Sequence, residues 1–175
     1  MSINEKILTT TYDFHFHAII ADLLADEKVN QLDLFNQHLN TSRLQHSINV
    51  AYFSYQLSKN RNVNVLDTVR AALLHDFFLY EWRSEQPVKG SHVTVHPQQA
   101  LLTAKSVTEV TPLMEDIILS HMWPVGRVKP KSKEAWIVSF ADKISTILEL
   151  STQLMTKSRR FAFSPIMISL LLFLT

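Results

Sequence analysis

A histidine and an aspartate stand side by side in an apolar stretch of the chain, at His75 and Asp76. Their neighbours over residues 71–79 are alanine, leucine and phenylalanine. An ionised carboxylate in apolar surroundings is costly unless it is paired or bound to a metal. The dipeptide therefore indicates a buried ion pair or a metal site.

Three histidines and one aspartate in separate segments extend this pattern. In chain order, the six candidate metal ligands are His46, His75, Asp76, His96, His121 and Asp142. Imidazole and carboxylate ligands without sulfur suit one or two divalent ions, of which Mn, Fe, Co, Mg, Ni and Zn are the candidates. The chain has no cysteine, so thiolate ligands and disulfides are excluded.

Five short pieces of sequence carry these ligands, and together they resemble the HD-domain superfamily of metal-dependent phosphohydrolases. The pieces are Arg43-Leu-Gln-His-Ser-Ile-Asn-Val50, Leu73-Leu-His-Asp76, His96-Pro-Gln-Gln-Ala100, Ser120-His-Met-Trp-Pro124 and Phe140-Ala-Asp-Lys143. The resembling stretch runs from about Arg43 to Glu149. More narrowly, the chain is similar to the small bacterial single-domain members of the two-metal type.

The resemblance implies a dinuclear metal site. One ion would be bound by His46, His75, Asp76 and Asp142, and the second by His96 and His121, with Asp76 bridging both. Adjacent residues on an ideal helix point about 100° apart. His75 can therefore bind one ion while the carboxylate of Asp76 reaches toward the other.

The activity that the resemblance implies is hydrolysis of a phosphoester or phosphoanhydride by metal-activated water. The expected substrate is a small phosphorylated metabolite, of which a nucleotide or dinucleotide is the favoured class. We expect Asp76 to be catalytic as well as a ligand. Lys143, next to Asp142, and Arg83, in the loop after the HD pair, are the expected cationic contacts of the substrate phosphate.

Two departures from relatives argue against the substrates of particular branches of the superfamily. Two functions other than hydrolysis also stay open. Leu79 stands where several two-metal relatives carry a lysine, and the Gly-Tyr-Pro signature of the cyclic-dinucleotide branch is absent. The aromatic residues of 77–83 fit either a surface that stacks a nucleobase or the core. A di-iron HD-type oxygenase would use the same ligand order. A non-catalytic nucleotide-binding module would keep the site without turnover.

Helices must position these ligands, because the chain has only two glycines and its apolar residues recur at helical spacing. The expected helices span about 18–39 with a break near 26–30, from a cap at Thr41 or Ser42 to about 60, from Asp67 or Thr68 through Phe78, from His96-Pro97 onward, from Pro112 through His121, and from Glu134 to Thr156. The predicted fold is all-α, a single HD-domain helical bundle of about six or seven helices.

The chain of 175 residues is long enough for one domain with a real core. We divide the single domain 1–175 into an N-terminal helical extension (1–40), an HD core (about 43–150) and an apolar C-terminal tail (157–175). The tail is short and interrupted by Pro165, so it gives no firm membrane signal. We interpret it as a segment that packs on the core or on a second subunit, which makes a homodimer an expected partner.

Charge and targeting signals limit the remaining partners. The net charge is +1, without a basic stripe, so no nucleic-acid partner is expected. The N-terminus lacks the charged and apolar regions of a secretory signal. Together with the absence of cysteine, this favours the cytoplasm.

Overall fold

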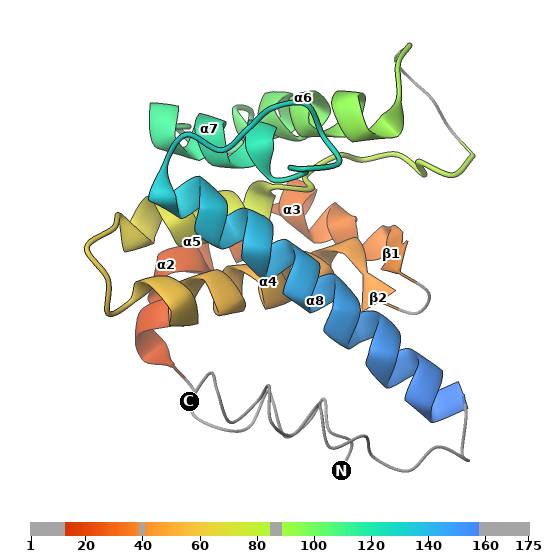
Figure 1. Ribbon diagram of the computed structural model, residues 1–175, viewed down its shortest axis with the longest axis horizontal. Helices are drawn as coiled ribbons and strands as arrows, with labels where there is room; N and C mark the ends of the chain where they lie inside the picture. The colour runs from red at the N-terminus through yellow and green to blue at the C-terminus, as the bar shows by residue number, and fades with distance from the viewer. Residues whose placement is uncertain (1–12, 39–40, 85–88, 158–175) are drawn as a thin grey trace.

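The computed structural model describes residues 13–38, 41–84 and 89–157, and the side chains of these segments as far as residue 152. The described residues form seven α-helices, a short 3₁₀ helix and a two-stranded sheet (Figure 1). In chain order they are α2 (Phe14–Leu24), α3 (Glu27–Asn30), η1 (Gln31–Leu34), β1 (Asn36–His38), β2 (Thr41–Ser42), α4 (Arg43–Ser58), α5 (Val65–Leu74), α6 (His92–Ala104), α7 (Pro112–Ser120) and α8 (Lys133–Lys157). The predicted helical fold is confirmed. Residues 1–12 of the N-terminal extension and residues 158–175 of the apolar tail lie outside the described residues.

Side-chain oxygens cap the first turns of six helices, which fixes where these helices begin. Each oxygen accepts a hydrogen bond from a backbone N–H that has no partner within its helix. The pairs are Asp13 with Phe16, Asp26 with Lys28, Ser42 with Gln45, Asn64 with Asp67, Thr111 with Met114, and Ser132 with Ala135, at 2.8–3.3 Å. The expected cap at Ser42 and the start of α7 at Pro112 are thereby confirmed.

Helix α5 occupies the middle of the bundle. It packs most extensively against α4 and α7, and it also contacts α2, α6 and α8. The long helix α8 crosses α4, and α6 lies beside α7 at one end of the molecule (Figure 1). Because the four ligand-bearing helices α4, α6, α7 and α8 all reach α5, the residues that follow α5 can meet side chains from every one of them.

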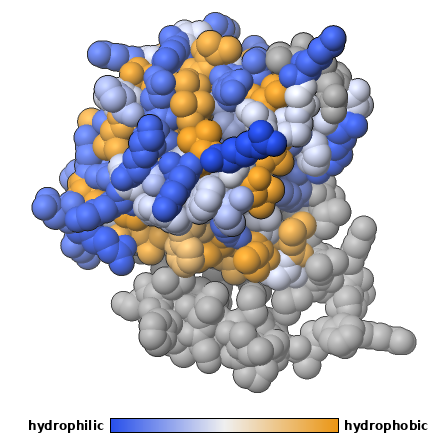
Figure 2. All heavy atoms as spheres, turned by 45° about the horizontal axis from the view of Figure 1, so that its top comes forward, coloured by the Kyte–Doolittle hydropathy of each residue, from blue (hydrophilic) through white to orange (hydrophobic). Residues whose placement is uncertain are grey.

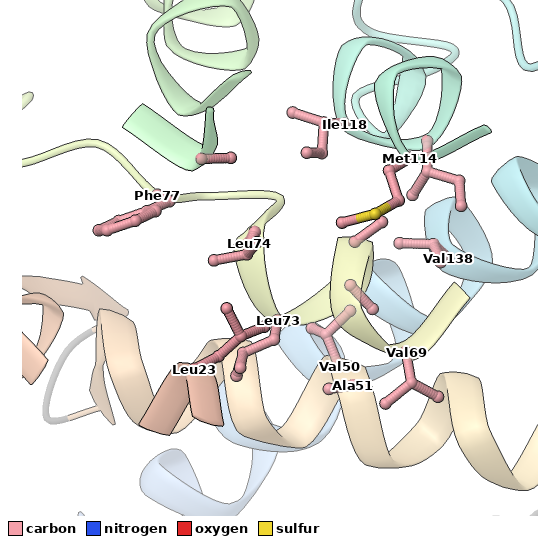
Figure 3. Close-up of a cluster of buried hydrophobic side chains, with 14 of the residues drawn as sticks. Leu23, Val50, Ala51, Val69, Leu73, Leu74, Phe77, Met114, Ile118 and Val138 are labelled. Atoms are coloured by element: carbon pink, nitrogen blue, oxygen red, sulfur yellow. The ribbon is translucent and has the colours of Figure 1, made fainter. Parts of the chain in front are cut away.

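The apolar core surrounds α5 on all sides. Every residue of 68–74 except Arg70 is buried, so the end of this helix has almost no solvent-facing side. Leu73 and Leu74 meet side chains from the neighbouring helices, among them Val50, Met114 and Ile118 (Figure 3). The tightly packed helix gives the HD pair that follows it a fixed position.

Hydrophilic side chains cover much of the face drawn in Figure 2, with a narrow strip of hydrophobic ones between them. Among the described segments, none of the helices is both long enough and apolar enough to cross a membrane.

The third expected helix ends earlier than the apolar pattern predicts, so its extension through Phe78 is wrong. Helix α5 ends at Leu74, and His75 takes the C-cap position. The His75 ring bonds through Nδ1 to the carbonyl of Ala72 at 2.7 Å, and the N–H of Phe78 donates to the carbonyl of Asp76 at 2.8 Å. The HD pair therefore lies in a turn, where a side chain satisfies one of the last free carbonyls.

Two other expected boundaries are also wrong. Helix α6 begins at His92 instead of His96, so Pro97 lies inside the helix and removes one of its internal hydrogen bonds. Residues 36–38 form strand β1, paired antiparallel with β2, in place of a helix end. The N–H of Arg43 donates to the carbonyl of Phe35 at 2.8 Å, which holds the chain reversal around this small sheet.

We expect Leu73→Ala to lower the free energy of unfolding by about 2–5 kcal/mol, because the fully buried side chain would leave a cavity in the core. Leu66→Ala is the matched control, since Leu66 lies on the same helix and is 53% exposed. Urea denaturation of both variants measures the difference. Equal destabilisation by the two substitutions would contradict the central position of α5.

Candidate metal centre

The structure brings all six candidate ligands together in the interior. Helix α4 supplies His46, the turn after α5 supplies His75 and Asp76, α6 supplies His96, the end of α7 supplies His121, and α8 supplies Asp142. All six are buried, and Asp142 is the most accessible at 9% exposed. Five helices and the turn after one of them therefore bring two kinds of group, imidazole and carboxylate, to one centre.

The first group of ligands, called the first set, comprises His46, His75, Asp76 and Asp142. The Nε2 atom of His46 lies 3.2 Å from Oδ1 of Asp142. The Nε2 atom of His75 lies 3.8 Å from the same oxygen and 3.5 Å from Oδ2 of Asp76. These nitrogen and oxygen atoms therefore face one another in the interior.

The second set comprises His96, His121 and the shared Asp76. The two imidazole Nε2 atoms are 3.0 Å apart. Oδ1 of Asp76 lies 3.3 Å from the Nε2 of His96 and 3.4 Å from that of His121. The carboxylate of Asp76 thus directs Oδ1 to the second set, while Oδ2 lies nearer the first.

These separations match those of metal ligands. Nitrogen and oxygen atoms that are each about 2.0–2.2 Å from one ion lie about 3–3.6 Å from one another. Two triads, His46 with His75 and Asp76, and Asp76 with His96 and His121, each have ligand atoms within 4.8 Å of one another. An ion can therefore be placed in either set without a large rearrangement of the side chains.

The protonation of three imidazoles is fixed by the backbone. The Nδ1 atoms bond to backbone carbonyls, from His75 to Ala72 at 2.7 Å, from His96 to His92 at 2.8 Å, and from His121 to Ile118 at 2.7 Å. A carbonyl only accepts hydrogen bonds, so Nδ1 carries the proton in each ring. In the neutral rings, each Nε2 then presents a lone pair to the centre.

Lone pairs that face one another in the interior require a cation between them. In neutral rings, the Nε2 atoms of His96 and His121 both present lone pairs at 3.0 Å, next to an oxygen of Asp76. His75 Nε2 and Asp76 Oδ1 are buried without a hydrogen-bond partner among the described residues. Buried polar atoms are rarely left in this state. The donor set therefore fits divalent metal ions.

The electrostatics of the centre favour ionised carboxylates at neutral pH. Burial alone would raise the pKa of Asp76, yet the neighbouring imidazoles of His75, His121 and His96 hold it well below its usual value. Burial likewise opposes ionisation of Asp142, but the hydrogen bond from His46 lowers its pKa to about 2. Metal ions bind the deprotonated forms of such groups.

The histidines differ in their affinity for protons. Burial lowers the pKa of His75 to about 4, so this ring is neutral at pH 7. Burial alone would also lower the pKa of His46, but hydrogen bonds to Asp142 and Glu149 outweigh it and raise the pKa to about 10. A proton on the Nε2 of His46 occupies the position that a metal ion would take, so metal binding would release it.

A polar contact behind Asp76 orients its carboxylate. The amide nitrogen of Gln37 donates to Oδ2 of Asp76 at 2.5 Å, and the amide oxygen of Gln37 accepts from Nε of Arg43 at 3.1 Å. Arg43 is fully buried, and its guanidinium lies 3.6 Å from the centre of the Phe78 ring. The arginine therefore fixes Gln37, which in turn fixes the shared aspartate.

The two expected phosphate contacts each hold a backbone carbonyl next to the centre. The ammonium of Lys143 donates to the carbonyl of His121 at 3.1 Å and to Ser139 at 2.9 and 3.0 Å. The guanidinium of Arg83 donates to the carbonyl of Gln37 at 2.9 Å and lies 4.4 Å from the centre of the Trp82 ring. Both cations thus lie beside residues of the centre. Their hydrogen bonds go to backbone carbonyls and to Ser139, and not to the side chains of the ligands.

Sequence analysis missed four residues that contact the ligands. They are Gln37 beside Asp76, Glu149 and His38 beside His46, and His92, whose ring stacks on His96 at 4.4 Å. For Glu149 a signal was present, because it follows Asp142 by seven residues and so lies on the same face of α8. His92 precedes His96 by one helical turn, which is a similar signal.

A family model of the HD domain matches residues 43–147, and the chain belongs to this family. Proteins of the family are typically metal-dependent phosphohydrolases. No curated protein and no solved structure matches the chain. The matched range contains all six candidate ligands, while Gln37 and Glu149 lie just outside it.

We expect Asp76→Asn to reduce the metal that the purified protein retains after dialysis, because the shared carboxylate loses its charge at both sets. Elemental analysis by mass spectrometry measures metal per chain. Asp22→Asn is the control, since it removes one carboxylate that is 64% exposed, pairs with Arg70 and is not one of the six ligands. Full metal retention by a folded Asp76→Asn protein would show that Asp76 is not a ligand.

Proposed function

We propose that this protein is a dinuclear, metal-dependent phosphohydrolase that acts on a small phosphorylated metabolite, with nucleotides or dinucleotides as the substrate class. One observation carries the proposal: the buried carboxylate of Asp76 directs one oxygen to each of two histidine sets. Two ions that share a ligand in this way are typical of enzymes that cleave phosphate esters.

Two bound divalent ions would lower the pKa of a water molecule and stabilise the charge that develops on phosphate oxygens. The residues of the chain supply the rest of the arrangement. Hydrogen bonds from Nδ1 fix three imidazole rings, and Gln37 fixes Asp76. Burial of the ligands keeps bulk water away, which strengthens electrostatic interactions within the centre.

We further propose that Lys143 and Arg83 stabilise the negative charge of the substrate phosphate in different ways. The three donors of the Lys143 ammonium already have oxygen acceptors, so this residue would act through its positive charge next to Asp142. Arginine has five N–H donors, and the bonds of Arg83 to Asn36 and Gln37 leave others for a phosphate oxygen. Its side chain is 45% exposed, so a substrate could reach it.

Phosphate release from a panel of nucleotides and dinucleotides, after the protein is loaded with Mn²⁺, Co²⁺ or Fe²⁺, tests the proposal. We expect metal-dependent release from at least one compound. Oxygen consumption by the iron-loaded protein without phosphate release would instead select the di-iron oxygenase. Tight nucleotide binding without turnover would select the non-catalytic module.

We expect His96→Ala to reduce the rate of phosphate release by more than about 100-fold, since even residues behind the ligands contribute about 10–100-fold in metal enzymes. His15→Ala is the matched control, because His15 is exposed on α2 and is not one of the six ligands. Turnover at saturating metal measures both variants. Unchanged turnover in His96→Ala would exclude the second set from the reaction.

A further inference from the structure

Glu149 is a buried carboxylate that stands behind the first set without belonging to it. It lies on α8, two helical turns after Asp142, and is 8% exposed. Its Oε2 and Oε1 atoms are 3.0 and 3.2 Å from Nδ1 of His46. A carboxylate accepts hydrogen bonds, so Nδ1 carries the proton and Nε2 is directed to Asp142 at 3.2 Å.

His46 is the one ligand histidine that has a carboxylate behind it. The Nδ1 atoms of the other three ligand histidines bond to neutral backbone carbonyls. A carboxylate behind a ligand imidazole fixes the ring and makes it a more basic, stronger ligand. The first set therefore has Asp142 and Glu149 in addition to the shared Asp76, whereas the second set has Asp76 alone.

The position of Glu149 is itself held by a chain of side-chain amides on α4. The amide nitrogen of Gln45 donates to the amide oxygen of Asn49 at 2.9 Å. The amide nitrogen of Asn49 in turn donates to Oε1 of Glu149 at 2.8 Å. Because Asn49 follows His46 by three residues, one face of α4 presents both the ligand and the group that orients its partner.

We propose that Glu149 is a positioning residue that holds His46 in place and makes the first set bind a divalent ion more tightly than the second, so that the two positions fill in order. The inference rests on the proposed dinuclear centre. The shared ligand Asp76 contributes to both positions, so the difference arises from the residues that each set has alone.

Titration of the metal-free protein with Co²⁺, followed by visible absorption and by calorimetry, tests this inference. For the wild-type chain we expect two classes of binding site with separate dissociation constants. In Glu149→Gln the tighter class should weaken by about 10–100-fold, because the amide keeps an acceptor for His46 but has no charge. The weaker class should change by less than about twofold, since the ligands of the second set are untouched.

Glu109→Gln is the matched control, because Glu109 is an exposed glutamate and the variant carries the same loss of charge. It should leave both classes unchanged. Glu149→Leu should weaken the tighter class further than Glu149→Gln, since leucine removes the acceptor as well. Circular dichroism and thermal unfolding establish that each variant is folded before titration.

Two results would overturn the inference and are distinguishable from failure of the proposed function. Two Co²⁺ classes in the wild type, with an unchanged tighter class in folded Glu149→Gln, would reject the role of Glu149 and leave the dinuclear centre standing. Loss of a third Co²⁺ class in that variant would make Glu149 a ligand and not a positioning residue. A wild-type chain that binds no Co²⁺ would reject both proposals.

Discussion

Asp76 keeps a negative charge in the interior of the protein, where an unpaired carboxylate is unstable. The buried end of α5 places it there, and polar groups from α6, the end of α7 and strand β1 offset the charge. His96 and His121 face one of its oxygens, while Gln37 and His75 face the other. The bundle must therefore bring these elements together around one carboxylate. The two oxygens of Asp76 divide the centre into two ligand sets.

A second layer of contacts holds the ligand side chains in their orientations. Backbone carbonyls fix three imidazole rings, a carboxylate fixes the fourth, and an amide held by a buried arginine fixes the shared aspartate. These contacts set which nitrogen of each ring faces the centre. Each ring of the centre is therefore already oriented with its Nε2 atom inward, and little movement of the side chains is needed when ions bind.

The sequence predicts most of the helices, because apolar periodicity is a local signal, and the resemblance to the HD superfamily selects six candidate ligands that the structure brings together. His46, His96, His121 and Asp142 come from four helices whose apolar periodicity is plain. The end of α5 was misplaced because the apolar pattern continues through Phe78, whereas the His75 side chain bonds to the last turn of the helix. Gln37 could not be found from the sequence, since it reaches Asp76 from a short strand that is held by tertiary contacts.

Crystals of the metal-loaded protein, measured at the absorption edge of the bound metal, would locate the ions. We expect two anomalous peaks about 3.5–4 Å apart, one among the first set and one beside His96 and His121, with Asp76 between them. A single peak away from Asp76, or no peak in crystals soaked with Mn²⁺ or Co²⁺, would contradict it.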